Sequence, residues 1–548
     1  MKRLYCILML TLMAAAMAAP AMAWEFSLKG HFIFEVDYLS QDKAQLFGPH
    51  DVDATAGGGH EQINFWPGLM APVDPNTTVS GNDAGWHTQW AELHPKIKIN
   101  KALSWESLVY LGAWDFNQGD GSGGANASAI ARISRSEYTN SFQRGVWRSM
   151  TPFYVNYWRV SMKLPWGNMS MGKRPSGWGI GLMQSGKHYI LKTSNTTSNS
   201  ISLTVPYGPL LIGVSFYPNR RGGEGYYNDD DRTNIRWANV AWGATYRCGP
   251  LETGFAIGHA YRHRGGERRI GNAGNSRDRA DLDAGAYFKY FNGRFFLNAE
   301  YREYDRIDVF TGEPRNYQDT ELRAWAVEGG AIAGPAKFSA LVANASGIDR
   351  RALDIASGSA IFKNNTISTC SQNFSNTSLF LPYSYLMVYQ YGTGVPGNGQ
   401  DGTGFFDAGQ FYGARVDYAV ASNMNVYATF CQVLRPYKGY GWGYIRPNAS
   451  GVIQYGQLQT ATVRSPAIPD DNLGWEVGTG VFWKLLEGLT VYTRLAYWQP
   501  GDWWKFACVS KSNPLWLTPT ADTVYWGTSP DRSIDPVIGG YFLTALEF

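Results

Sequence analysis

The sequence predicts an all-β fold, a transmembrane antiparallel β-barrel of about 18 strands, with 16 as the alternative count. Three observations predict it: segments in which apolar and polar residues alternate, connections that are alternately short and long, and a composition rich in aromatics and glycine. Aromatics make up 15% of the 548 residues, with 21 Trp, 33 Tyr and 62 Gly. Barrel strands need apolar residues only at alternate positions, and aromatic girdles border their apolar band.

The N-terminus has the pattern of an export signal. Lys2 and Arg3 precede an apolar stretch, and residues 21–23 (Ala-Met-Ala) form the small-x-small site that signal peptidase accepts. We expect residues 1–23 to be a cleaved signal peptide and 24–548 to form one barrel domain in a Gram-negative outer membrane. No later segment approaches the ~20 consecutive apolar residues that a membrane helix needs.

Alternation is clearest in the first segment after the signal. Even positions from Phe26 to Tyr38 are apolar or Gly, whereas odd positions from Glu25 to Asp37 are polar except for Ile33. A wall with lipid on one side and water on the other requires this period of two. The same pattern predicts strands at 24–39, 89–100, 105–117, 152–164, 168–177, 198–206, 210–218, 236–247, 251–263, 281–291, 294–304, 320–333, 336–346, 409–419, 423–434, 473–485, 488–499 and 536–548.

The connections between these strands alternate in length. Eight are tight turns of mostly Gly, Pro and Asn, such as 292–293 and 334–335, and nine are longer, such as 118–151 and 347–408. Short periplasmic turns and long extracellular loops are typical of bacterial outer-membrane barrels. The longest loop, 347–408, has few charges and many small polar residues, so we expect it to fold inward as a pliable segment that buries little apolar surface and narrows the pore.

The C-terminal strand ends on an aromatic residue. Phe542, Leu546 and Phe548 share one face of it. This pattern resembles the signal by which outer-membrane proteins are passed to the barrel-assembly machinery, so we predict that role for these residues. An even number of strands also lets the first and last strands pair, which leaves no open edge in the lipid.

Alternation sorts the charged residues between the two faces of the wall. On the lumen side basic residues slightly outnumber acidic ones, which predicts either a weak preference for anions or compensation by cross-strand ion pairs. We expect the following basic residues to line the pore: Lys96, Lys98, Arg159, Lys163, Arg174, Arg294, Arg302, Arg323, Arg415 and Arg494.

One motif carries a resemblance to a known family. Residues 169–181 contain Lys173-Arg174 followed by Gly177-Trp178-Gly179. This resembles the Gly-Arg…Trp-Gly element found where the chain leaves the wall in large porin-like barrels of the alginate-export type. The resemblance implies an 18-stranded outer-membrane channel for passive diffusion of small polar or anionic solutes, and no chemical reaction.

Cysteine and histidine positions bear on the alternatives to a channel. Four cysteines follow the signal, none in a Cys-x-x-Cys pair, and a disulfide between Cys370 and Cys508 stays open. His259 and His263 would lie about 13 Å apart on a strand, too far to share a metal ion, so no metal site is predicted. No cofactor, catalytic residue or nucleic-acid partner is predicted either. Expected partners are outer-membrane lipid, the assembly machinery and small polar solutes. The alternative function is a barrel sleeve around a multihaem cytochrome, whose partners would be periplasmic or surface cytochromes.

Overall fold

The structure is a computed structural model, and it describes residues 24–41, 83–115, 148–149, 153–175, 178–182, 197–217, 235–264, 276–311, 317–345, 377–387, 409–434, 470–502, 516–520, 523–526 and 536–548. The described part is almost entirely β-structure. It contains one short helix, α4 (Thr377–Phe380). No helix among the described residues is long and apolar enough to cross a membrane.

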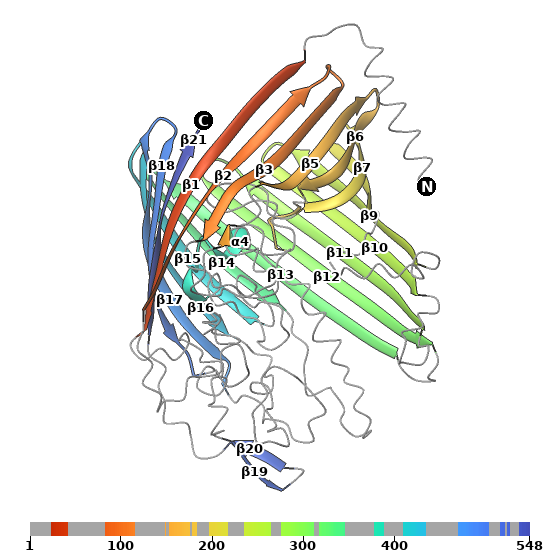
Figure 1. Ribbon diagram of the computed structural model, residues 1–548. Helices are drawn as coiled ribbons and strands as arrows, with labels where there is room; N and C mark the ends of the chain where they lie inside the picture. Colours follow the sequence, from red (N-terminus) through yellow and green to blue (C-terminus); the bar gives the residue numbers. More distant parts are fainter. Residues whose placement is uncertain are drawn as a thin grey trace.

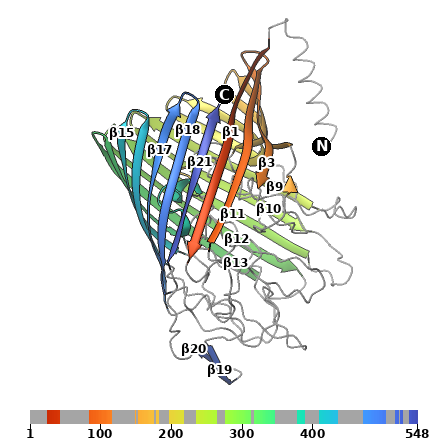
Figure 2. The ribbon, with the colours of Figure 1, turned by 60° about the vertical axis from the view of Figure 1, so that its left-hand side comes forward.

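Eighteen antiparallel strands form the wall (Figures 1 and 2). They are β1 (Glu25–Gln41), β2 (Asp83–Lys98), β3 (Leu103–Asp115), β5 (Phe153–Leu164), β6 (Gly167–Pro175), β7 (Thr197–Tyr207), β8 (Leu210–Tyr217), β9 (Ile235–Cys248), β10 (Leu251–Arg264), β11 (Ser276–Phe291), β12 (Phe295–Thr311), β13 (Tyr317–Ala333), β14 (Ala336–Ala345), β15 (Gly409–Ala421), β16 (Met424–Leu434), β17 (Asn472–Leu486), β18 (Leu489–Pro500) and β21 (Val537–Glu547). Each of the 18 predicted strands is confirmed, so the alternative count of 16 is wrong.

The ring of strands is closed. Each strand pairs antiparallel with its neighbours in the chain, and β1 pairs with both β2 and β21, so that no edge of the ring is left open. Across the closing seam His31 lies opposite Glu547 and Val36 lies opposite Phe542. Three shorter strands lie outside the count of 18: β4 (Arg148–Ser149) pairs with the end of β3, and β19 (Trp516–Thr520) pairs with β20 (Thr523–Trp526).

The connections are short at one end of the barrel and mostly long at the other, as predicted. Several short turns use glycine with positive φ, including Gly208, Gly249 and Gly334. Others are closed by an asparagine side chain: Asn292 Oδ1 accepts hydrogen bonds from the backbone N–H groups of Arg294 (3.0 Å) and Phe295 (2.8 Å). Cys370 and Cys508 lie outside the described residues.

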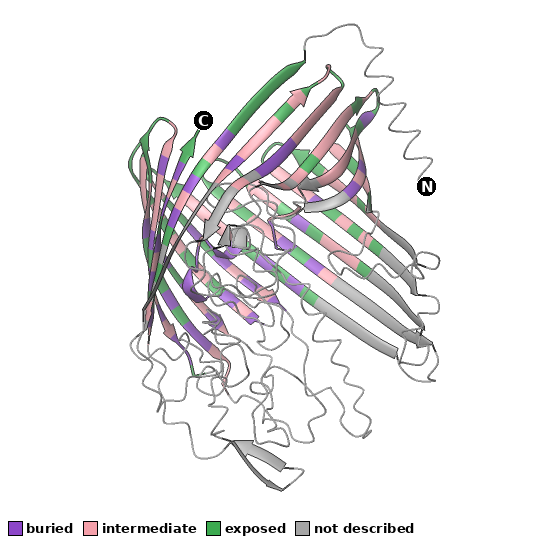
Figure 3. Ribbon diagram, in the orientation of Figure 1, coloured by how far each residue is buried: buried purple, intermediate pink, exposed green. Residues whose placement is uncertain are grey.

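The two faces of the wall differ in chemistry. Large apolar side chains such as Trp242, Phe255 and Leu495 are more than half exposed on the outer face, where a lipid bilayer would cover them. Buried and half-buried residues alternate with these exposed positions along the strands (Figure 3). The inner face includes buried polar and charged residues, among them Glu300 and Arg494.

Candidate channel constriction

A segment of the longest loop lies inside the ring of strands. Residues 377–387, which lie between β14 and β15 in the chain, contact the inner face of the wall, and Figure 1 shows α4 enclosed by the strands. The side chains of this segment that are fully or almost fully buried are Leu379, Phe380, Leu381, Tyr383, Ser384, Tyr385, Leu386 and Met387. The prediction that loop 347–408 buries little apolar surface is therefore wrong for residues 377–387, because the apolar residues of the loop are concentrated there.

One carboxylate of the wall holds this segment. Glu476, fully buried on the inner face of β17, accepts hydrogen bonds from the backbone N–H groups of Tyr385 (2.6 Å), Leu386 (3.1 Å) and Met387 (2.8 Å). The Ser384 hydroxyl donates a fourth at 2.8 Å. Three successive N–H groups that converge on one anion form a backbone nest, in which the peptide dipoles compensate the buried charge.

Two arginines hold the other side of the segment. Arg494 on β18 donates to the carbonyl oxygen of Leu381 and lies 3.9 Å from Glu476. Arg415 on β15 donates to the carbonyl oxygen of Pro382 at 2.9 Å. The segment is therefore held through backbone amides on one side and backbone carbonyls on the other, in a buried environment where such charge-assisted bonds are strong.

A second segment, residues 178–182, enters the lumen just after β6 and is held in the same way. Glu300, buried on the inner face of β12, accepts hydrogen bonds from the backbone N–H groups of Ile180 (2.8 Å), Gly181 (3.0 Å) and Leu182 (3.0 Å). Gly179 precedes these with a φ of 67°, and a Cβ there would lie 2.3 Å from Glu300 Oε2. Only glycine fits this turn.

Aromatic stacking completes the second attachment. The Arg302 guanidinium lies over the Trp178 ring at 4.4 Å, and the same ring meets Tyr287 edge-on at 4.7 Å. Arg302 also forms ion pairs with Glu300 and Asp283, both at 3.3 Å. The Trp-Gly motif at 178–179 therefore lies where the chain leaves β6, and its contacts are with β11 and β12.

The predicted pore-lining residues fall into three groups. The paired ones on the inner face are Lys98 with Glu25 (2.6 Å), Arg159 with Glu106, Arg302 with Glu300 and Asp283, Arg415 with Asp417 (2.8 Å) and Arg494 with Glu476. Lys96 and Lys163 are exposed on that face near the short turns, and register places Arg174 opposite Ser198 although its side chain lies outside those described. Among the predicted basic residues whose side chains are described on the inner face, most therefore have their charge compensated by a carboxylate of the wall.

Two predictions about this face need correction. Arg323 lies on the outer face, because it is paired in register with Glu303 on the side that carries the exposed Trp325, and its guanidinium contacts Glu303 at 3.2 Å. It does not line the pore. Arg294 lies in the turn before β12 and is exposed at the rim, so it does not line the wall between the strand ends.

The closing seam involves the predicted C-terminal residues. Phe548 and Gly30 exchange backbone hydrogen bonds of 2.9 and 3.0 Å. The Phe548 ring covers Gly30, where a Cβ would lie 2.4 Å from ring carbon Cζ. Phe542, Leu546 and Phe548 are all exposed on the outer face. Their role as an assembly signal stays a prediction.

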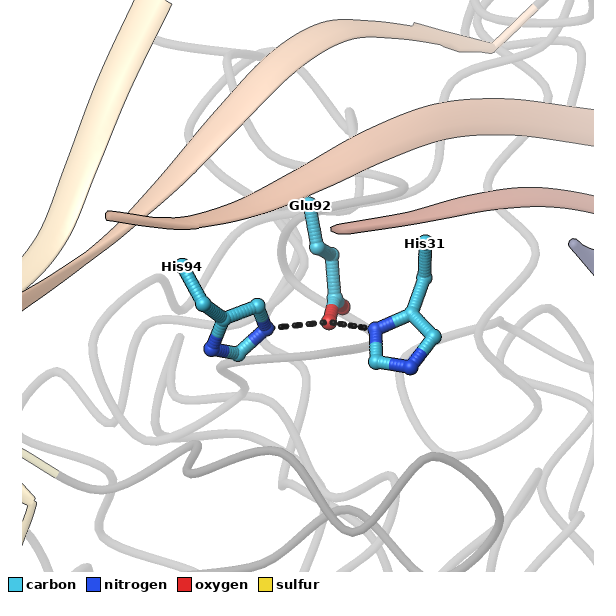
Figure 4. Close-up of side chains that lie close together, drawn as sticks. All are labelled: His31, Glu92 and His94. Atoms are coloured by element: carbon cyan, nitrogen blue, oxygen red, sulfur yellow. Dashed lines mark ion pairs between the residues drawn. The ribbon is translucent and has the colours of Figure 1, made fainter. Parts of the chain in front are cut away.

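A histidine–glutamate cluster lies on the inner face close to this seam. Glu92 is fully buried, and its Oε2 lies 3.9 Å from His31 Nδ1 and 3.7 Å from His94 Nε2 (Figure 4). The sequence predicts no metal site here, because His31 is 61 positions from Glu92 and only strand pairing brings them together. The available signal was Glu92 and His94 at i, i+2, which share a face of one strand.

The fold and the inner face together define a class of protein. The chain forms a closed antiparallel β-barrel of the kind that spans bacterial outer membranes, with 18 strands in the ring, an apolar outer face and a lumen that holds two wall-bound segments.

Comparisons with known proteins identify structural but no sequence relatives. No family model matches the chain, and no curated protein matches it. OccK11 (OpdR) of Pseudomonas aeruginosa matches at 8% identity and a TM-score of 0.43, over 95% of this chain and 96% of its own. OpdL of the same species matches at 10% identity and a TM-score of 0.44, over 95% and 99%. OmpT of Vibrio cholerae matches at 10% identity and a TM-score of 0.33, over 97% and 99%. These likenesses concern the fold.

Proposed function

We propose that the protein is an outer-membrane channel for passive diffusion of small polar solutes, with a lumen narrowed by residues 178–182 and 377–387. The observation that carries this proposal is a closed wall of 18 strands whose lumen contains two segments bound to buried carboxylates. Barrels of 16–18 strands enclose an aqueous channel. Segments fixed inside such a channel reduce its cross-section and select solutes by size.

The fixed segments favour a channel over a cytochrome sleeve. A sleeve has to leave its lumen to a second protein, whereas here the buried residues of 377–387 occupy space next to β15, β17 and β18. The two buried glutamates that hold the segments, Glu476 and Glu300, are engaged by backbone amides and are not free to act as a catalytic acid or base. We therefore propose a transport role without a chemical step.

Charge selectivity in this channel is weak and favours anions. Most lumenal arginines are bound to carboxylates, which cancels much of their field. Lys96 and Lys163 remain exposed on the inner face near the short turns, and lysines at a pore mouth attract anions.

Recording from the purified barrel in a planar bilayer tests the proposed function. We expect discrete, ohmic openings with a conductance below that of an unobstructed 18-stranded pore, and slow permeation of solutes too large for the constriction. A folded barrel that shows no conductance, but supports electron transfer with a multihaem cytochrome, would replace the channel by the sleeve.

Reversing charge at the mouth should change ion selectivity. In the double variant Lys96→Glu and Lys163→Glu, we expect the reversal potential in a salt gradient to move toward that of a cation-preferring pore, because two lumenal positive charges become negative. Arg323→Glu is the matched control, since Arg323 lies on the outer face. An equal shift in the control would contradict the assignment of faces.

A further inference from the structure

His31, Glu92 and His94 form a group of metal-binding side chains on the inner face of β1 and β2. Strand register pairs His31 directly with Glu92, and His94 lies two residues further along β2 on the same face. One donor atom from each side chain lies within 4.8 Å of the other two. In Figure 4 the three side chains point to a common space, with the Glu92 carboxylate between the two imidazoles.

The distances in this group do not correspond to hydrogen bonds. His31 Nδ1 and His94 Nε2 lie 3.9 and 3.7 Å from Glu92 Oε2, beyond the range of an N–H···O bond. Both nitrogen atoms are buried without a hydrogen-bond partner. Buried polar atoms normally have a partner, so two such nitrogens directed at one carboxylate indicate that a ligand belongs between them.

The spacing suits an ion shared by the three residues. Donor atoms around a tetrahedral zinc ion lie about 3.3 Å apart, given metal–ligand bonds of about 2.0–2.1 Å. The separations of His31 Nδ1 and His94 Nε2 from Glu92 Oε2 exceed this by about half an ångström, which small side-chain rotations can close. Two imidazoles and one carboxylate are a common ligand set for zinc and related divalent ions, and they leave one coordination position open.

The surroundings supply further features of such a site. His31 Nε2, on the far side of the ring from the proposed metal, lies 3.7 Å from the Glu547 carboxylate of β21. This distance is also beyond hydrogen-bond range, and a side-chain rotation that closes it by about half an ångström would let the carboxylate orient the ring behind the metal. The side chains of His31 and His94 are 22% and 27% exposed, so an ion can reach them from the lumen. Lys29 lies opposite His94 in register and favours an anion at the open position.

We propose that His31, Glu92 and His94 bind one divalent transition-metal ion of the zinc type on the lumen wall, which ties β1 to β2 next to the seam where β21 closes the barrel. The site is independent of the channel function, because the ion binds to the wall and not to residues 178–182 or 377–387.

Zinc binding to the full barrel tests this site. The folded protein in detergent, stripped with a chelator and titrated with zinc chloride in a calorimeter, should bind one ion per chain. His31→Ala and His94→Ala should each lower the affinity by at least about 100-fold, since a lost ligand costs more than the 10–100-fold typical of an outer partner. His259→Ala is the matched control, because His259 is an exposed strand histidine on the outer face, and it should bind zinc like the parent.

A second measurement uses the unmodified protein, so that a folding defect in a variant does not decide the result. Cobalt bound at the site should give the intense visible absorption of four-coordinate Co²⁺ with nitrogen and oxygen ligands, and zinc should abolish it. Absence of zinc binding to the folded parent would overturn the proposal. Equal zinc affinity of the parent and a folded His94→Ala variant, judged by heat-modifiable migration, would also overturn it.

Discussion

Replacing Glu476 by Ala should release residues 377–387 from the wall and raise single-channel conductance. The substitution removes four hydrogen bonds to the segment and leaves Arg494 buried next to Thr429 without its carboxylate. Breaking a buried ion pair by removing one partner costs roughly 3–5 kcal/mol. That loss acts first on the segment, because the strands keep their own hydrogen-bond ladders. Bilayer recording should show larger and noisier openings.

Two variants separate release of the segment from a general effect of losing a charge. Glu476→Gln keeps one oxygen acceptor but no charge, so we expect a conductance between those of the parent and Glu476→Ala. Glu252→Gln is the matched control, since Glu252 is also on the inner face and is bound to Arg247 and Lys289 of the wall rather than to a segment in the lumen. Unchanged conductance in a folded Glu476→Ala barrel would show that residues 377–387 do not constrict the pore.

Replacing Phe548 by Ala should lower the yield of assembled barrel. The ring covers Gly30 across the closing seam, and an aromatic over a cross-strand glycine replaces the side-chain packing that the glycine lacks. A cross-strand pair of this kind contributes about 0.2–1 kcal/mol, but it acts at the pairing of β1 with β21, without which the barrel would expose two strand edges. The fraction of heat-modifiable protein in isolated outer membranes measures the effect.

The substitution Gly30→Leu alters the same contact from the side of β1. A side chain there would collide with both the Phe548 ring and the backbone oxygen of Glu92, so we expect a larger defect than in Phe548→Ala. Phe255→Ala is the matched control, because Phe255 is exposed on the outer face of β10, away from the seam. If Phe255→Ala lowered the folded fraction as much as Phe548→Ala, the effect would be one of lost apolar surface and not of closure.

Most of the wall could be predicted from the sequence because each strand faces two solvents. A residue pattern such as Phe26–Tyr38 has only one register in which apolar side chains meet lipid, which fixes both the strand and its orientation. The rule that charged residues face the lumen fails on the part of the outer face that lies beyond the apolar band. There Glu303 and Arg323 form an outward ion pair beyond the exposed Tyr301 and Trp325, and charge alone no longer indicates the lumen.

The lumenal contacts could not be predicted in the same way. Glu476 binds residues about 90 positions away, and Glu300 binds residues about 120 positions away. Nothing in the local pattern around either glutamate distinguishes it from a solvated carboxylate of the wall. The sequence did suggest that loop 347–408 turns inward and that the chain leaves the wall at the Trp-Gly motif, but the partners of each segment follow from tertiary structure alone.

The way the two lumenal segments are attached has a consequence for the evolution of this protein. Glu476 and Glu300 bind peptide N–H groups, which every residue except proline possesses. Side-chain substitutions at the donating positions of residues 178–182 and 377–387 therefore leave these backbone bonds in place, provided that the two glutamates and Gly179 persist and no proline enters. Solute preference can diverge between descendants while the architecture of the barrel is inherited intact, and each of the two inserts can be exchanged separately by an engineer.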